Sequence, residues 1–311
     1  MKRQPSRKLR PVPDRVDVKV GFACNNKCRF CVQGRKREKY GRRDVEELTG
    51  IIEKNRDRCE GVVFTGGEPS LHPDIVDLVT KAAELGYPSI QIQTNGRMFA
   101  YMKFAKKMSR AGANEFSPAL HGHIAELHDY LTTVPGSFEQ TVQGIRNLKE
   151  LGHNVITNSV ITRSNFRHLP ELAEKLVDLG VDQYQLAFVH PVGSAGPDMN
   201  FDSVVPRFEL LKPYLHKALD VGLEAGITVM TEAVPYCYLK GYEEYAGEKV
   251  MPATRIFDAE GIIEDYREYR LGEGKLKGPA CEKCLHYFDC EGPWREYAER
   301  YGWNEFIPIE E

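Results

Sequence analysis

Apolar residues recur along this chain with two spacings, one of every second residue and one of every third or fourth residue. Over residues 89–94, isoleucines alternate with glutamines, as in a β-strand with one buried face. Over residues 137–151, the apolar positions follow a helical period. These patterns predict strands at 16–22, 61–65, 89–94, 115–120, 155–161, 184–189 and 227–231, and helices at 44–58, 72–86, 100–111, 137–151, 169–179 and 204–225.

The predicted strands and helices alternate, which favours a parallel sheet with helices outside it. The six strand–helix units before residue 200 fit an α/β fold, a partial (βα)6 TIM-like barrel. We expect a basic N-terminal tail over 1–15, the barrel over 16–232, and a small cysteine-bearing C-terminal extension over 233–311, where the alternation stops. In such barrels the chemistry gathers at the C-terminal ends of the strands.

Composition narrows the class of protein. The chain has 311 residues and a formal charge of −3, which favours neither a nucleic-acid binder nor a membrane binder. No apolar stretch approaches the roughly 20 residues that span a bilayer, and no signal-peptide core follows the start, so a cytoplasmic protein is expected. The basic tail is interpreted as a solvated surface, whereas the basic run 35–43 is a candidate contact for a substrate phosphate or carboxylate.

Seven of the eight cysteines fall into clusters, which is typical of metal ligands in a reducing compartment. Cys24, Cys28 and Cys31 follow the first predicted strand with a three-then-two spacing. Thiolates this close together converge on one soft metal centre, either zinc or an iron–sulfur cluster. Structural zinc takes four ligands, and no fourth Cys or His lies within about 25 residues downstream. Three ligands leave one coordination position open, as a reactive centre requires.

A second motif, Gly66-Gly67-Glu68-Pro69, ends the second predicted strand. The two motifs together, in this order, resemble the radical S-adenosylmethionine (SAM) enzymes. The resemblance implies that the three cysteines hold a [4Fe-4S] cluster whose fourth iron binds SAM. It further implies reductive cleavage of SAM to a 5′-deoxyadenosyl radical that takes a hydrogen atom from the substrate.

The same resemblance implies a set of cofactor-binding residues. The Gly-Gly turn lets backbone approach a ligand closely, and the segment Gly66–Pro69 is expected to bind the SAM amino group. Phe30 either covers the cluster and adenine or simply packs. Four polar residues are candidates for binding the ribose and the methionine carboxylate of SAM: Thr94, Ser117, Asn158 and Arg163. Two histidines, His121 and His190, are candidate contacts for the substrate. The alternative for each of these six residues is an ordinary hydrogen-bonding or packing role.

The C-terminal cysteines resemble the SPASM/twitch extensions that carry auxiliary iron–sulfur clusters. Trp294 stands where a full SPASM domain has a further cysteine. We therefore expect one auxiliary [4Fe-4S] cluster, with a zinc site formed by the same four residues as the alternative. The expected ligands are Cys237, Cys281, Cys284 and Cys290, whereas Cys59 is interpreted as a plain thiol.

Enzymes of this type commonly modify peptides or proteins, or build small cofactors. We favour peptide or protein modification, with a low-potential electron donor such as ferredoxin or flavodoxin as partner. Cofactor biosynthesis on a small molecule is the first alternative, and a non-catalytic zinc-binding adaptor is the alternative from another class.

Overall fold

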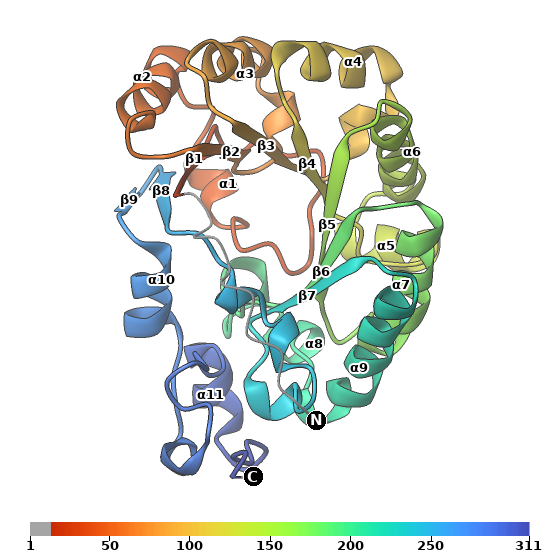
Figure 1. Cartoon of the computed structure of the whole chain (residues 1–311), viewed down its shortest axis with the longest axis vertical. Helices are drawn as coiled ribbons and strands as arrows, with labels where there is room; N and C mark the ends of the chain where they lie inside the picture. The colour runs from red at the N-terminus through yellow and green to blue at the C-terminus, as the bar shows by residue number, and fades with distance from the viewer. Residues whose placement is uncertain (1–13, 311) are drawn as a thin grey trace, which may run out of the picture.

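The computed structural model describes residues 14–310 and contains one mostly parallel sheet with helices outside it (Figure 1). The strand order is β7-β6-β5-β4-β3-β2-β1-β8-β9, so β7 and β9 are the two edges of an open barrel. The strands are β1 (Arg15–Lys19), β2 (Gly61–Thr65), β3 (Ser89–Thr94), β4 (Glu115–Pro118), β5 (Asn154–Ile161), β6 (Gln183–Phe188), β7 (Thr228–Glu232), β8 (Thr254–Asp258) and β9 (Gly261–Ile263). All neighbours pair in parallel except β8 and β9, as the alternation of strands and helices predicts.

Helices connect the successive parallel strands and cover the outer face of the sheet (Figure 1). The longer ones are α2 (Val45–Asn55), α3 (Ile75–Glu84), α4 (Met102–Ala111), α5 (Ala125–Thr132), α6 (Ser137–Glu150), α7 (Leu169–Asp178) and α9 (Phe208–Glu224). Shorter helices are α1 (Lys36–Lys39), α8 (Phe201–Val204), α10 (Tyr266–Tyr269) and α11 (Arg295–Tyr301). None of the helices within residues 14–310 is both long and apolar enough to cross a bilayer.

The two faces of the sheet differ in polarity because successive side chains of a strand point to opposite sides. Val16 and Val18 of β1 are fully buried toward the helices, and Ile90 and Ile92 of β3 share this core. The intervening positions carry polar side chains on the opposite face: Asp17 and Lys19 on β1, Gln91 and Gln93 on β3, Asn158 on β5 and Gln185 on β6. The concave side of the open barrel is therefore polar.

Several predicted elements are longer than the observed ones, among them the helices predicted at 44–58 and 72–86 and the strand predicted at 115–120. The helix predicted at 204–225 begins only at Phe208, as α9, because Pro206 cannot donate a backbone hydrogen bond and the residue before it, Val205, is extended. The strand predicted at 16–22 ends at Lys19, since the chain turns at Gly21, whose φ is +154°. The expected basic tail lies outside the described residues, apart from its last two positions.

The sheet continues into residues 233–311, which the sequence predicts as an extension. Strand β8 pairs in parallel with β1, and Arg15 lies opposite Thr254. The basic run 35–43 binds this part of the chain: Lys36 Nζ lies 2.7 Å from a carboxylate oxygen of Asp258, and Arg43 Nη1 donates to the carbonyl oxygen of Phe257 at 2.9 Å. The cations of this run therefore attach the segment after the first cysteine loop to the edge of the barrel.

Candidate active site

The first cysteine loop runs between β1 and α1 at the C-terminal ends of the parallel strands. Its three cysteines, Cys24, Cys28 and Cys31, are free thiols that are partly exposed. The loop backbone is hydrogen-bonded to the end of α5, where Lys27 N donates to Thr132 O at 2.9 Å. A second bond joins Arg29 N to Leu131 O at 3.0 Å. The spacing of the cysteines is thus held by a neighbouring helix.

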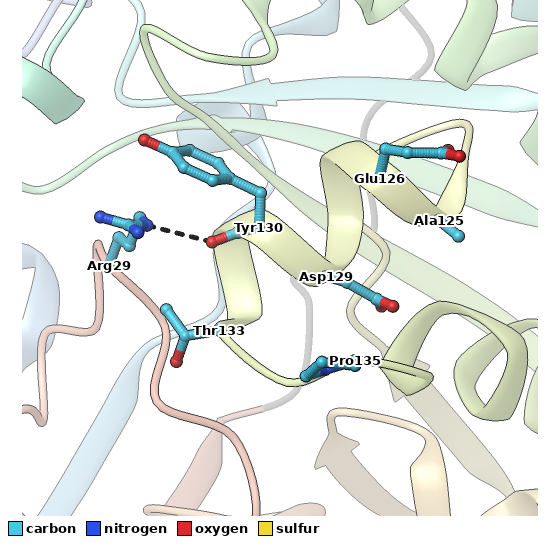
Figure 2. A pocket seen from close by; sticks show the side chains of 7 residues that line it. All are labelled: Arg29, Ala125, Glu126, Asp129, Tyr130, Thr133 and Pro135. Carbon is cyan, nitrogen blue, oxygen red and sulfur yellow. Dashed lines mark hydrogen bonds between the residues drawn. The ribbon is translucent and has the colours of Figure 1, made fainter.

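A surface pocket lies between this loop and α5, and Figure 2 shows the side chains around it. Arg29 Nε donates to Tyr130 O at 3.1 Å, and the guanidinium carbon lies 4.2 Å from the centre of the Tyr130 ring. Below it, the Asp129 carboxylate accepts from Ser137 Oγ and from the backbone N–H of Phe138, both at 2.8 Å. These bonds fix α5 to the start of α6, and through Arg29 they fix the cysteine loop.

Polar hydrogens point at the sulfur atoms of the first loop. Asn26 N lies 3.4 Å from Cys24 Sγ, and Arg37 Nη2 lies 3.6 Å from Cys31 Sγ. Burial raises the pKa of Cys24 to about 11, and burial and then the charges of the other two cysteines raise the pKa of Cys28. Thiols with a raised pKa still become thiolates when they bind a cation. N–H donors to sulfur suit an iron–sulfur cluster, whose potential they tune, so these residues fit the implied cluster.

The Gly-Gly turn packs directly on the entrance of the cysteine loop. Gly67 N donates to Gly21 O and Glu68 N donates to Ala23 O, both at 2.8 Å. A Cβ atom on Gly66, which has φ +123°, would lie 2.2 Å from Gly21 O, and one on Gly67 would lie 2.4 Å from Ala23 O. The close approach that these glycines permit is therefore to the chain's own backbone, which sets the loop against the end of β2.

The Glu68 carboxylate joins the ends of β2 and β3. Its Oε1 atom accepts from Ser70 N at 3.0 Å and from Thr94 Oγ1 at 2.6 Å, and its Oε2 atom accepts from Asn95 N at 2.6 Å. Burial raises the pKa of this carboxyl, whereas the hydrogen bonds oppose that effect. Both oxygens accept, so the ionised form fits the site. Pro69 follows as the first residue of a short 3₁₀ turn.

Glu68→Gln should lower the free energy of unfolding by about 1–3 kcal/mol, because the amide leaves a buried donor without an acceptor. Urea unfolding measures this loss. The matched control is Glu84→Gln, at an exposed residue of α3 that should change stability by less than about 0.5 kcal/mol. Equal stabilities of the two variants would contradict the assigned role of Glu68.

The end of β3 also reaches the cysteine loop, through two residues that were not among the candidate binding residues. Asn95 Nδ2 donates to Asn25 Oδ1 at 2.6 Å. Arg97 Nη1 donates to Asn26 Oδ1 at 2.8 Å. Thr94-Asn95-Gly96 resembles the motif after the third strand of the family, but the sequence does not show these contacts, which join residues about 70 positions apart.

The remaining SAM candidates separate in space. Ser117 lies in register with Gln93, and Asn158 lies in register with Gln185, so both face the polar side of the sheet. The buried Oδ1 atom of Asn158 has no hydrogen-bond partner among the residues that the structure describes. Arg163 is exposed, and its Nη1 atom donates to Asp202 O at 2.6 Å rather than to the cysteine loop.

His121 is a buried ring that lies behind the cysteine loop. Its Nδ1 atom accepts from Val160 N at 3.2 Å, and its ring meets the edge of Phe30 at 4.7 Å between centroids. Burial, followed by the charge of His128, lowers the pKa of His121 well below its usual value. His121 is therefore neutral at pH 7, and Phe30 is buried against it.

His190 lies at the end of β6 and stacks on Trp294, with ring centroids 3.7 Å apart. Burial, and then the charges of Lys275 and Arg270, lower the pKa of His190 to about 3. This side chain is thus a neutral aromatic surface where the barrel meets the C-terminal segment.

The four C-terminal cysteines line one pocket, although Cys237 is 44 positions before Cys281 in the chain. Backbone N–H groups point at two of the sulfurs, from Gly292 to Cys290 and from Ile309 to Cys284, both at 3.4 Å. Burial, and then the charges of the other three cysteines, raise the pKa of Cys237 to about 12. The chemistry of this donor set fits a thiolate-bound iron centre, as at the first loop.

Within residues 14–310, no three or more His, Cys, Asp or Glu side chains are placed so that together they could hold a single metal ion. Cys59 is buried at the end of α2, apart from both cysteine groups.

A family model described as the radical SAM superfamily matches residues 18–176, just over half of the chain. The chain belongs to the radical SAM superfamily. This match contains the cysteine loop and the Gly-Gly turn, and it confirms the resemblance drawn from these two motifs. The superfamily is one of enzymes, and it implies a [4Fe-4S] cluster and SAM.

Curated radical SAM relatives are similar over part of their length. The AdoMet-dependent heme synthase of Oleidesulfovibrio alaskensis is 29% identical over 178 residues, which is 57% of this chain and 45% of that protein. A probable GTP 3′,8-cyclase of Saccharolobus islandicus is 31% identical over 188 residues, which is 59% of each protein. The chain thus spans about half the length of the curated relatives it matches.

Solved structures of radical SAM enzymes share the fold. Streptococcus suis SuiB bound to S-adenosylmethionine aligns with a TM-score of 0.64 at 18% identity, over 92% of this chain and 67% of that chain. The structure of anSMEcpe with bound AdoMet and a peptide aligns with a TM-score of 0.58 at 17% identity, over 70% of this chain and 63% of that chain. The predicted partial TIM-like barrel is confirmed by this likeness.

Proposed function

We propose that this radical SAM protein cleaves S-adenosylmethionine reductively at the first cysteine loop and abstracts a hydrogen atom from a peptide or protein substrate. One observation carries the proposal. Three partly exposed thiols lie at the C-terminal ends of parallel strands, on a loop held by α5, by the Gly-Gly turn and by the end of β3. This is the edge of the sheet where barrel enzymes bind their substrates.

The residues of the loop have distinct roles in this proposal. Cys24, Cys28 and Cys31 would hold the cluster, which would supply the electron for cleavage of SAM. Asn26 N and Arg37 Nη2 donate hydrogen bonds to sulfur and stabilise its negative charge. A rigid loop keeps the reacting groups in a fixed geometry, which lowers the entropic part of the barrier.

SAM itself is proposed to lie on the polar face of the sheet beside this loop. Ser117 and Asn158 face that side, and Asn158 Oδ1 is a buried acceptor that a ligand hydroxyl or amine would satisfy. The Gly66–Pro69 segment borders the same edge through its bonds to the loop entrance. Arg163 is the weakest of the candidates, because its guanidinium is engaged with Asp202.

The peptide or protein substrate is supported by the C-terminal cysteines, which resemble an auxiliary-cluster extension. Two proteins with a similar fold, SuiB bound to the precursor peptide SuiA and anSMEcpe bound to a peptide, are consistent with it. The alternative is cofactor biosynthesis on a small molecule. It is favoured by the curated relatives, a heme synthase and a GTP cyclase.

Iron and acid-labile sulfide analysis of protein reconstituted anaerobically tests the two metal centres. Two [4Fe-4S] clusters predict about eight irons per chain and a brown colour that dithionite bleaches. One zinc per cysteine group and no colour would instead support the non-catalytic adaptor. An electron donor such as ferredoxin or flavodoxin and a cytoplasmic location belong to the same proposal.

A further inference from the structure

A buried arginine connects the barrel to the auxiliary cysteines. Arg270 is fully buried, and its guanidinium lies 2.7–2.8 Å from the carboxylates of Glu232, Glu248 and Glu291. Glu232 ends β7, whereas Glu291 directly follows Cys290. The charge of Arg270 is thus offset by carboxylates in direct contact with it.

A second cation, Lys275, lies beside this network without such a partner. Its side chain is only 3% exposed, and Nζ has neither a hydrogen bond nor an ion pair within residues 14–310. Nζ lies 3.7 Å from the ring centre of Trp294, the residue that stacks on His190. A cation over the face of Trp is stabilised by the ring, but its charge is not neutralised. Lys275 therefore adds a second positive charge to a buried network that already holds Arg270 and three carboxylates.

This charge lies close to the last auxiliary cysteine. The backbone of Lys275 pairs with that of Trp294, and Leu276 N donates to Pro293 O at 3.1 Å. The two segments run so close that a Cβ atom on Gly292 would collide with the Leu276 carbonyl. The charge of Lys275 also lowers the pKa of the Cys290 thiol, against the larger opposing effect of burial. The segment that carries Lys275 is therefore packed directly against the segment that follows Cys290.

We propose that the ammonium of Lys275 raises the reduction potential of an auxiliary iron–sulfur centre held by the four C-terminal cysteines. The inference rests on the function proposed above for these cysteines. A fixed cation stabilises the additional electron of the reduced centre, and burial strengthens this effect because the local dielectric is low. Lys275 is then a residue that tunes the centre without touching the substrate.

Lys275→Met should make the auxiliary centre harder to reduce. We expect a roughly tenfold change in the reduction equilibrium, which is about 59 mV for a one-electron couple. Redox titration of the reconstituted full chain, monitored by electron paramagnetic resonance at about pH 6, measures it. The centre at the first cysteine loop is the internal reference and should keep its potential.

Lys277→Met is the matched control. Lys277 lines the cysteine pocket, its Nζ atom is bound to the carbonyl oxygen of Tyr287, and its half-buried side chain is screened by water. Its loss should shift the potential much less than the loss of Lys275. Equal potentials of the auxiliary centre in Lys275→Met and the wild type would overturn the inference. Loss of iron would appear separately in the iron analysis and would count against the proposed function.

The wild type provides a test that needs no variant. Burial, and then the charge of Arg270, lower the pKa of Lys275 to about 7. The ammonium is present below this value and is lost above it, so the auxiliary potential should fall as pH rises from about 6 to 8.5. The groups that face Lys275 are Arg270, His190, Glu232, Glu248, Glu291 and Glu296.

Burial raises the pKa of both Glu248 and Glu296, so these two carboxyls also titrate above their usual range. Their contribution to the pH dependence should persist in Lys275→Met, whereas that of Lys275 should disappear. A pH dependence of the same size in the variant and the wild type would contradict the role of Lys275. Methionine is similar to lysine in length and leaves no unpaired polar atom at this buried site; Lys275→Gln, which keeps a polar group there, provides a second variant.

Discussion

Cys28→Ala should reduce the formation of 5′-deoxyadenosine from SAM to the level of a protein-free control. Cys28 is the central ligand of the proposed cluster, and burial and both neighbouring cysteines raise the pKa of its thiol. With two thiols left on the loop, the cluster loses the ligand set that leaves a single open iron. Chromatography of the products formed under dithionite, anaerobically and with SAM in excess, measures this activity.

The matched control is Cys59→Ala. Cys59 is a buried thiol at the end of α2, apart from both cysteine groups, so its loss should cost some stability but leave SAM cleavage intact. Cleavage that survives Cys28→Ala at the wild-type rate would show that the first loop is wrongly assigned. Loss of cleavage in both variants would point to unfolding, which circular dichroism detects.

Cys284→Ala should separate SAM cleavage from substrate turnover. The variant should lose about four irons and all turnover of the true substrate. SAM cleavage without substrate should remain near the wild-type rate, because the first loop is held by α5 and the Gly-Gly turn. Cys284 Sγ faces the backbone N–H of Ile309 in the C-terminal pocket, distant in sequence from both of those supports.

Iron analysis and cleavage assays on the same preparation of Cys284→Ala distinguish the possible outcomes. Full substrate turnover with four irons missing would show that the auxiliary centre is only structural. An unchanged iron content would show that Cys284 is not a ligand. Either result would contradict the auxiliary role while leaving the first cluster untouched.

The elements that carry local signals could be predicted from the sequence. Strand β3 alternates isoleucine with glutamine, and α6 has a clear helical period, so both were predicted within one residue of their ends. The order of the parallel strands follows from the alternation of strands and helices. The start of α9 was predicted too early although Pro206 signals the break before it, because the apolar period continues across the proline.

Contacts between distant segments could not be predicted. Strand β8 pairs with β1 across more than 230 residues, and nothing local in its five residues specifies that neighbour. The bond between Lys27 and the end of α5 likewise requires the tertiary fold, as do the contacts of Arg97. Sequence patterns identify candidate ligands by type and spacing, whereas the groups that hold them in place come from other elements.

Tertiary contacts also decide where the side chains of the single candidate residues point, which the sequence does not predict. Arg163 follows β5 as expected, but its guanidinium turns toward Asp202. His121 is bound on Nδ1 by Val160, and His190 is stacked on Trp294. Placement at a strand end is set by the chain order, whereas the direction of a long side chain is set by its neighbours. The Lys275 and Arg270 network had no signal in the sequence beyond scattered charges.

Production of 5′-deoxyadenosine by the anaerobically reconstituted wild-type chain tests the central claim most directly. Protein carrying iron and sulfide should be brown and, with dithionite and SAM, should release 5′-deoxyadenosine and methionine in equal amounts. Protein that takes up iron and sulfide in full but releases neither product under these conditions would contradict the account.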